Sequence, residues 1–336
     1  MKFCIGELTS IRTGKLDANA SSEDGQYPFF TCSREPLKID TYSYDCECVL
    51  IAGNGDLNVK YYNGKFDAYQ RTYIIEDNSN GKLFMPYLYW FMQGYIEELR
   101  KQAIGGVIKY IKLGNLTEAI IDLPSVDEQK EVVKRMEIVS DIISEQRCLM
   151  AMMGDLIKSR FVEMFTTCDK VATMEELCTI ITDGTHQPPK FQAEGIPFIF
   201  VSNLSENKVT YDAEKFISED TYNELYKRTP IEVGDILLST VGSYGHPAVV
   251  EEERKFLFQR HIAYLKPKRE LINSYYLHGA LLSPEGQRQI EERVKGIAQK
   301  TLNLSEIRKI KIPVPCIEQQ KQYEQFIHEV DKLKVA

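Results

Sequence analysis

The amino-acid sequence contains an internal duplication that spans almost all of its 336 residues. Segments of the first half recur in the same order in the second half: GQYPFFTCS with GIPFIFVSN, CVLIAGNG with DILLSTVGSYG, AYQRTYII with FQRHIAYL, and IGGVIKYIKLGNLTEAIIDLPSVDEQKEV with KGIAQKTLNLSEIRKIKIPVPCIEQQKQY. The last pair aligns without a gap, whereas the earlier pairs drift by short insertions of the kind that loops tolerate. A repeated unit this long is a domain rather than one turn of a solenoid. The fold is therefore restricted to two copies of one domain.

Each copy predicts the same order of elements. Short runs rich in β-branched and aromatic residues, such as YPFFTC and RTYIIE, are split by turn residues and indicate strands. A helix follows in each copy, then a strand that ends at proline (AIIDLP, IKIPVP), then a longer helix. The order predicts an α+β fold in which two duplicated domains, each a mixed β-sheet with helices, are joined by long antiparallel coiled-coil-like helices. The predicted boundaries are 1–124 for the first domain, 125–168 for the central helix, 169–315 for the second domain and 316–336 for the C-terminal helix.

The central helix is predicted to begin after Ser125, because Ser125 and Glu128 have the spacing of a capping box. Mostly apolar residues then recur about every 3.5 positions, which is typical of a coiled-coil seam roughly 50 Å long. The second copy of this helix begins at Ile317 and is about half as long, so we expect it to pack against the first. The seam positions are Val132, Met136, Val139, Ile143, Gln146, Met150, Met153, Ile157, Arg160 and Met164.

Composition adds few constraints. The net charge of −8 argues mildly against nucleic acid, although residues 286–312 form a local basic stretch that a solvated helix face would also explain. The eight cysteines lack paired C-x-x-C spacing, so reduced, buried thiols and no metal site are expected. The start MKFCIGELTS lacks the pattern of a signal peptide, and no apolar run is long enough for a membrane span, so we expect a cytoplasmic protein with no membrane partner.

The duplicated closing segments DLPSVDEQKEVV and IPVPCIEQQKQY, each leading into a heptad helix, resemble the specificity (S) subunit of Type I restriction–modification enzymes. The stretches STVGSYG and IITDGTHQPPKFQAEGIPFIFVSN are also similar to that family, and the resemblance covers essentially the whole chain. It implies two target-recognition domains that each read one part of a split, asymmetric site in double-stranded DNA. It also implies a non-catalytic subunit that needs no cofactor and acts within a DNA adenine methyltransferase and endonuclease complex.

The resemblance further implies two methyltransferase (M) subunits as partners, and it leaves open whether restriction (R) subunits also join. The final helix is shorter than this family usually carries, which puts the symmetry of partner recruitment in question. Two alternatives stay open: a specificity subunit of a related methylation-only or Type II-like system, and a two-domain scaffold that binds no DNA.

An enzyme is the rival class, and its motifs are incomplete. The segment QPPK at 187–190 has two prolines, but it lacks the Asn or Asp and the aromatic residue of an adenine methyltransferase motif, so we interpret it as a loop. Asp122, Glu128 and Lys130 match a nuclease-like D…E-x-K pattern, but Glu128 already has a predicted capping role.

The candidate DNA contacts lie in the repeated loops. Glycines let backbone approach phosphate closely, although they can equally serve turns alone. Arginine pairs naturally with guanine and glutamine with adenine, so the two Gln-Arg pairs are proposed base readers, with a salt bridge at a strand start as the alternative. For the histidines a structural role is the alternative. The candidates are Lys15, Arg34, Asn54, Gln70, Arg71, Lys109, Tyr110, Thr185, His186, Asn203, Ser243, Tyr244, Gln259, Arg260, His261 and Lys300.

Overall fold

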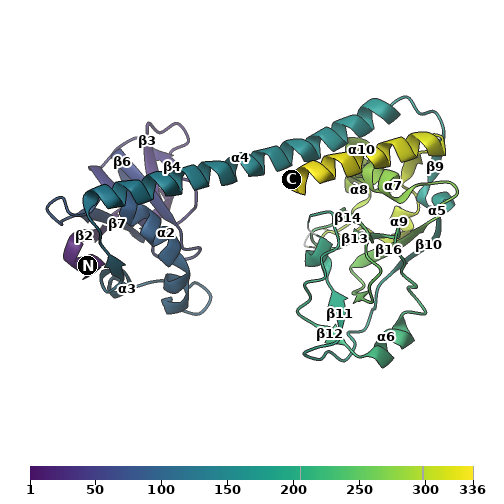
Figure 1. Ribbon diagram of the computed structural model, residues 1–336, viewed down its shortest axis with the longest axis horizontal. Helices are drawn as coiled ribbons and strands as arrows, with labels where there is room; N and C mark the ends of the chain where they lie inside the picture. Colours follow the sequence, from purple (N-terminus) through teal and green to yellow (C-terminus); the bar gives the residue numbers. More distant parts are fainter. Residues whose placement is uncertain (205, 297–298, 336) are drawn as a thin grey trace. The chain divides into compact units, whose positions relative to one another are not determined.

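The computed structural model describes residues 1–204, 206–296 and 299–335. The chain divides into two compact units, Met1–Gln146 and Arg147–Ala336 (Figure 1). We call them unit 1 and unit 2 and describe each by itself.

Unit 1 is built on a six-stranded sheet in the order β2-β7-β5-β6-β3-β4. Its neighbours are antiparallel except for β3 and β6, which run parallel, and β1 pairs separately with β8. The elements are β1 (Lys2–Cys4), α1 (Ile5–Leu8), β2 (Thr9–Thr13), η1 (Ala18–Ala20), β3 (Tyr27–Phe30), β4 (Leu37–Ile39), β5 (Tyr44–Ala52), β6 (Val59–Ala68), β7 (Thr72–Asp77), α2 (Met85–Gln102), α3 (Leu113–Thr117), β8 (Ile120–Asp122) and α4 (Val126–Phe165), which ends in unit 2.

Unit 2 repeats this topology. The order β10-β16-β13-β14 matches β2-β7-β5-β6, the parallel pair β11 and β15 matches β3 and β6, and β9 pairs with β17 as β1 does with β8. Two short strands, β14 and β15, replace the long β6, so one sheet becomes two. The elements are β9 (Val171–Thr173), α5 (Met174–Leu177), β10 (Cys178–Asp183), β11 (Ile196–Ile199), η2 (Val201–Leu204), β12 (Phe216–Ile217), α6 (Glu219–Leu225), β13 (Ile236–Ser239), β14 (Pro247–Val249), β15 (Leu257–Phe258), β16 (Ile262–Pro267), α7 (Ser274–Leu282), α8 (Pro284–Arg293), α9 (Leu304–Ile307), β17 (Lys311–Pro313) and α10 (Ile317–Val335).

The predicted fold class is confirmed, including the two repeated domains. One boundary in the second copy differs from the expected single helix over 273–294. The chain forms two helices there, α7 and α8, because Pro284 cannot continue a helix and instead occupies the first turn of α8. Ser283 caps α8 by accepting a hydrogen bond from the amide of Gly286 (3.1 Å).

Both faces of the main sheet of unit 1 are buried. Alternate residues of β5 point to opposite faces, so Val49 and Ile51 pack towards α2 while Cys48 and Leu50 belong to a second apolar cluster. A sheet buried on both faces is a firm platform for the loops at its ends.

The repeated Glu-Gln segments have a structural role that the sequence did not reveal. Gln129 is fully buried; its Oε1 accepts from the Phe84 amide (2.8 Å) and its Nε2 donates to the carbonyls of Lys82 (2.8 Å) and Pro124 (2.9 Å). This side chain ties the start of α2 to the start of α4, and it satisfies backbone groups that a helix terminus leaves without partners.

Gln320, also fully buried, makes the same three bonds in unit 2. It accepts from the Asn273 amide (2.8 Å) and donates to the carbonyls of Leu271 (3.2 Å) and Pro315 (2.9 Å). Here it ties the start of α7 to the start of α10, so both units contain the same glutamine-mediated joint between two helix starts.

The capping box at the start of α4 is confirmed. The Ser125 amide donates to Glu128 Oε2 (2.9 Å), and the Glu128 amide donates to Ser125 Oγ (3.4 Å). The hydrogen bonds from Ser125 lower the pKa of Glu128. Glu128 therefore performs the capping role that the sequence predicted.

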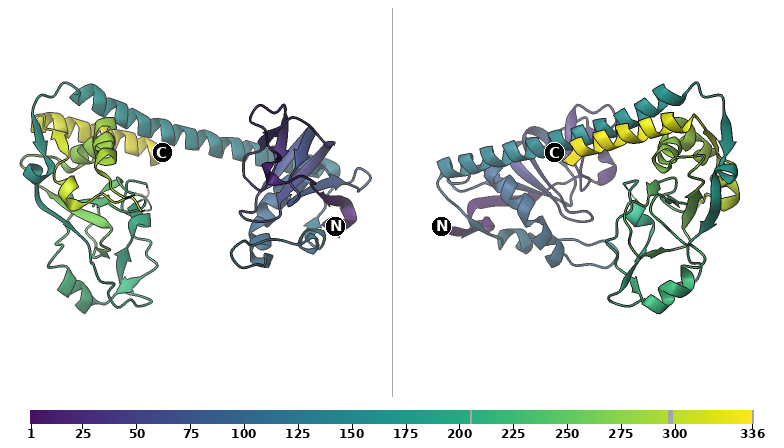
Figure 2. Two further views of the ribbon diagram at one scale, coloured as in Figure 1. Left: turned by 180° about the vertical axis from the view of Figure 1, so that it is seen from behind. Right: turned by 45° about the vertical axis from the view of Figure 1, so that its right-hand side comes forward.

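Within unit 2, α10 runs antiparallel beside the C-terminal part of α4, as the views in Figures 1 and 2 agree. Tyr323 packs on Phe161 with ring centroids 5.3 Å apart, and its hydroxyl donates to the Ile157 carbonyl (3.3 Å). The guanidinium of Arg160 lies 5.9 Å from the ring centroid of Phe326.

The predicted seam is partly wrong. The buried residues of α4 include Val133, Phe161 and Phe165, each one position beyond a predicted seam residue. The contacts of the 19-residue α10 with α4 lie near the C-terminal end of α4, where the predicted seam residues Ile157 and Met164 pack against the core of unit 2. The exposed seam positions are Val132, Met136, Val139, Ile143 and Met150.

The cysteines are all free, but the expectation that they are buried is wrong in part. Cys48 and Cys178 are buried, whereas Cys148 and Cys316 are exposed. Within residues 1–204, 206–296 and 299–335, no helix combines the length and the apolar character that a membrane span needs.

Candidate nucleic-acid interface

Loops from four parts of unit 1 meet at one end of its sheet. β2 and β5 end there and the antiparallel β7 begins there, so residues 14–16, 53–58 and 69–71 are neighbours. The segment 104–110 joins them after α2. The Gly53 amide donates to the Arg71 carbonyl (2.8 Å), and the Gly55 amide donates to the Lys109 carbonyl (2.9 Å). We call these four segments the unit 1 loop cluster.

Unit 2 builds the equivalent cluster from 184–186, 240–245, 259–261 and the described parts of 295–301, here called the unit 2 loop cluster. The Thr240 amide donates to the His261 carbonyl (2.9 Å), and the Gly242 amide donates to the Lys300 carbonyl (3.3 Å). The Thr185 amide donates to the Phe258 carbonyl (3.0 Å), as the Lys15 amide does to Ala68 (3.2 Å). The duplication therefore extends from the sheets to the loops.

The structure corrects the pairing of the two Gln-Arg segments by one residue. The bond from Gly53 reaches the Arg71 carbonyl, whereas its counterpart from Thr240 reaches His261. β7 begins at Thr72 and β16 at Ile262, which gives the same register. Arg71 therefore corresponds to His261, and Gln70 corresponds to Arg260. The sequences seemed to align there because the Gln-Arg pair stands one place earlier in the second copy. Lys109 and Lys300 do correspond as predicted.

The basic side chains in and beside the unit 1 loop cluster differ in whether they make ion pairs. Lys15, Arg71 and Lys109 are exposed, and in the described part of the chain none of them makes an ion pair. Arg34 instead pairs through Nε with Asp56 Oδ2 (2.9 Å). The salt-bridge alternative for Arg71 is thus not realised, and this side chain is available to a ligand.

Asp56 is shared between two arginines. Arg34 holds one carboxylate oxygen and Arg100 Nη2 lies 3.1 Å from the other. The hydrogen bond from Arg34, followed by that from Arg100, lowers the pKa of Asp56. The only carboxylate within the loop cluster is therefore neutralised by its neighbours.

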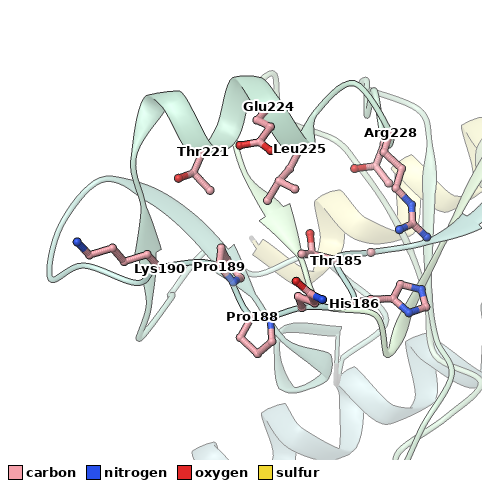
Figure 3. A pocket seen from close by; sticks show the side chains of 12 residues that line it. Thr185, His186, Pro188, Pro189, Lys190, Thr221, Glu224, Leu225 and Arg228 are labelled. Atoms are coloured by element: carbon pink, nitrogen blue, oxygen red, sulfur yellow. The ribbon is translucent and has the colours of Figure 1, made fainter.

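Three basic side chains at the unit 2 loop cluster, His186, Arg228 and Lys300, contact carboxylates. Asp183, at the end of β10, lies 2.8 Å from His186 Nε2 through Oδ2 and 2.7 Å from Arg228 Nη2 through Oδ1. Thr185, His186 and Arg228 line a cavity of about 530 Å³ beside α6 (Figure 3). Lys300 Nζ lies 2.9 Å from Glu291 Oε1, and this hydrogen bond and one with Tyr244 raise the pKa of Lys300.

Arg260 and His261 form a neighbouring pair in unit 2. Arg260 is exposed, and its Nε donates to His261 Nε2 (3.3 Å). Burial, and then the charge of Arg260, lowers the pKa of His261, so the imidazole is neutral at pH 7. The guanidinium of Arg260 has further donors that remain free to meet a base or phosphate.

The other residues predicted to contact DNA differ in their exposure and in their backbone pairing. Asn54 and Tyr110 pair across the unit 1 loop cluster through an isolated bridge, and Thr185 and Gln259 do so in unit 2. Ser243 is exposed at the tip of its loop, and Gln70 is exposed beside Arg71.

Asn203 is the weakest candidate, because it is buried and its side chain is used within its own loop. Its Oδ1 accepts from the Phe200 amide (2.9 Å), and its Nδ2 donates to the Asp212 carbonyl (3.2 Å). Asp56, Asp183 and Arg228 were not among the residues predicted from the sequence. Asp183 was visible as the acid beside Gly184 and His186, whereas Arg228 reaches the cluster from a distant helix end that no local motif marks.

The two enzyme-like motif fragments found in the sequence have structural surroundings. QPPK lies in a loop, as predicted. Glu128 of the nuclease-like pattern is a helix cap. In residues 1–204, 206–296 and 299–335, no cluster of three or more His, Cys, Asp or Glu side chains is arranged to hold a metal ion.

Comparison with known proteins places the chain among restriction–modification proteins. Residues 1–148 and 170–336 match the Type I restriction modification DNA specificity domain. The chain is 38% identical over 190 residues to the specificity subunit of Type I restriction enzyme EcoDI of Escherichia coli, a match covering 56% of this chain and 41% of that protein. It is 25% identical over 279 residues to the EcoBI specificity subunit of the same organism, covering 74% and 58% respectively. The chain thus spans about half the length of these relatives.

Solved structures show the same fold. The S subunit of a Type I restriction–modification system from M. genitalium superposes with a TM-score of 0.57 at 16% identity, covering 99% of this chain and 90% of that one. A chain from a structure concerned with complex assembly and conformational transition of the Type I system gives a TM-score of 0.51 at 18% identity, covering 99% and 91%. With matches in both duplicated halves, this chain belongs to the family of Type I restriction modification DNA specificity domains.

Proposed function

We propose that the chain is the DNA sequence-recognition subunit of a Type I restriction–modification enzyme. It binds a bipartite, asymmetric site in double-stranded DNA and recruits methyltransferase (M) and restriction (R) subunits, with no catalysis of its own. The observation that carries the proposal is the repeated loop cluster: each unit presents an arginine and a lysine on glycine-rich loops at the same end of its sheet. Two M subunits are the number that the family resemblance implies.

The unit 1 loop cluster has side chains for both kinds of DNA contact, and the unit 2 loop cluster has an arginine suited to base edges. Lys15 and Lys109 are exposed cations that suit phosphate, which positions the protein without reading sequence. Arg71 and Gln70 in unit 1, and Arg260 in unit 2, present the donors that suit guanine and adenine edges in the major groove. The negative net charge is compatible with DNA binding because the contacts are local.

The two half-sites should be unequal because the clusters differ at matched positions. Arg71 always carries a charge and a fork of donors, whereas its counterpart His261 is a neutral imidazole at pH 7. Lys109 is unpaired among the described residues, whereas Lys300 is bound to Glu291. The same scaffold thus presents different recognition groups in its two copies.

The salt dependence of duplex DNA binding tests this proposal. Measured with the M subunit present, log K should fall linearly with log salt, and Lys15→Ala with Lys109→Ala should reduce the slope by about 2, at roughly 0.9 per phosphate contact. The matched control is Lys82→Ala, since Lys82 is exposed but follows β7 at the opposite end of the sheet. Binding that is absent, or insensitive to salt, would instead favour the scaffold alternative.

A further inference from the structure

The segment 104–110 forms a narrow hairpin that projects from the unit 1 loop cluster. Ile104 and Tyr110 exchange two backbone hydrogen bonds, of 3.0 and 2.8 Å. Gly105 has φ +123°, and a Cβ there would lie 2.4 Å from the Ile108 carbonyl oxygen. The turn is therefore tight and its tip is held in one place.

The tip of this hairpin is apolar and exposed. The relative exposure of Val107 is 104% and that of Ile108 is 62%. An isolated exposed apolar residue needs no explanation, but two adjacent ones at the tip of a tight hairpin form a contiguous apolar point. Ile104 and Tyr110, at 44% and 36%, extend this surface towards the base of the hairpin.

Basic side chains lie near the base of the hairpin. Residues 99–117 contain four basic residues and no acidic residue. Arg100 and Lys101 make ion pairs, whereas Lys109 makes none among the described residues. Lys109 is fixed beside Gly55, and Gly53 is bonded to Arg71, so two unpaired cations lie at the base of the hairpin. The nearest carboxylate of the cluster, Asp56, is held by Arg34 and Arg100.

We propose that Val107 and Ile108 act as a wedge that inserts between base pairs of the half-site bound by unit 1. The inference rests on the proposed DNA-recognition function and adds a second mode of recognition to it. An apolar wedge partly unstacks one base step and kinks the duplex, and the cost depends on the sequence of that step. Unit 1 would then select a deformable step in addition to the bases that its side chains contact.

The shape of the tip favours DNA over a protein partner. A stable protein interface buries about 800 Å² on each partner, which two side chains on a narrow turn cannot supply. A gap between stacked bases needs only a thin apolar edge with cations on either side to hold the phosphates. The position in unit 2 that corresponds to Ile108 is the polar Gln299, so the strongest distortion is expected at the unit 1 half-site.

The test uses duplexes that carry the mapped target site, with 2-aminopurine placed at successive positions of each half-site. With the M subunit present, wild-type protein should raise the fluorescence at one step of the unit 1 half-site. The Val107→Ser, Ile108→Ser double variant should abolish that rise and weaken binding roughly five- to twentyfold. Its salt slope should stay unchanged, because no cation has been removed. The adenine that becomes methylated is left out of the comparison, since the M subunit can unstack it independently.

Leu37→Ser, at another exposed apolar residue of unit 1, is the matched control and should leave both signals as in wild type. Thermal melts of the three proteins check that the loop substitutions leave the fold intact. An unchanged 2-aminopurine rise in the double variant would overturn the wedge. So would a double variant that loses the rise together with binding of the M subunit, which would assign the tip to a protein contact. If the wild-type protein binds no duplex, the proposed DNA-recognition function is wrong, and this result is distinct from both outcomes that overturn the wedge.

Discussion

Replacing Gln129 with leucine is expected to lower the free energy of unfolding of unit 1 by about 2–4 kcal/mol, since it leaves three backbone groups without their hydrogen-bond partner. Those groups are the Phe84 amide and the carbonyls of Lys82 and Pro124. Leucine has a similar volume, so packing is retained and the lost bonds dominate the effect. Urea unfolding followed by circular dichroism measures the change.

The duplication supplies the controls for this substitution. Gln320→Leu should destabilise unit 2 by a similar amount, because Gln320 makes the same three bonds there. Gln319→Leu, at the exposed neighbouring position, should change stability by less than about 0.5 kcal/mol. If Gln319→Leu and Gln320→Leu proved equally mild, the buried glutamine would not be the joint described above.

Replacing Arg71 with alanine should weaken binding to the cognate site by about 1–3 kcal/mol, or roughly fivefold to more than a hundredfold, if Arg71 contacts a guanine through two donors. The physical reason is that Arg71 is exposed and makes no ion pair among the described residues, so its fork of donors is free. Competition binding against cognate and scrambled duplexes, with the M subunit present, measures the loss.

Two further variants separate base reading from phosphate contact. Arg71→Lys keeps the charge but not the fork, so it should restore non-specific affinity while specificity stays low. Arg260→Ala should act on the other half-site, since Arg260 lies in the unit 2 loop cluster. Equal weakening of cognate and scrambled DNA by Arg71→Ala would reassign Arg71 to phosphate, and wild-type binding would leave it a structural residue.

Much of the fold could be predicted from the sequence because the duplication provided two independent copies of each local signal. The strands at YPFFTC and RTYIIE and the capping box of Ser125 and Glu128 depend on residues close in sequence, and these predictions are confirmed. The seam of α4 was predicted only in part: Ile157 and Met164 pack against the core as predicted, but the buried residues Phe161 and Phe165 lie one position further on. Here Phe161 faces Tyr323 on α10, and spacing along one helix does not contain that contact.

The site was harder to predict than the fold. The sequence marked the loops that carry Arg71 and Lys109 as separate candidates and did not predict that they meet, and the pairing of Arg71 with Arg260 relied on a letter match. Backbone hydrogen bonds place His261 at that position instead. Lys109 makes no ion pair among the described residues, whereas Lys300 pairs with Glu291 of α8. Long-range electrostatics of this kind cannot be read from local sequence.

Genome-wide mapping of methylated adenines, in cells with and without this gene, tests the central claim most directly. One methylated motif should disappear with the gene, and it should consist of two unequal half-sites separated by a gap of fixed length. A motif that persists after deletion, or a single continuous motif that depends on the gene, would contradict recognition of a bipartite site by two duplicated domains.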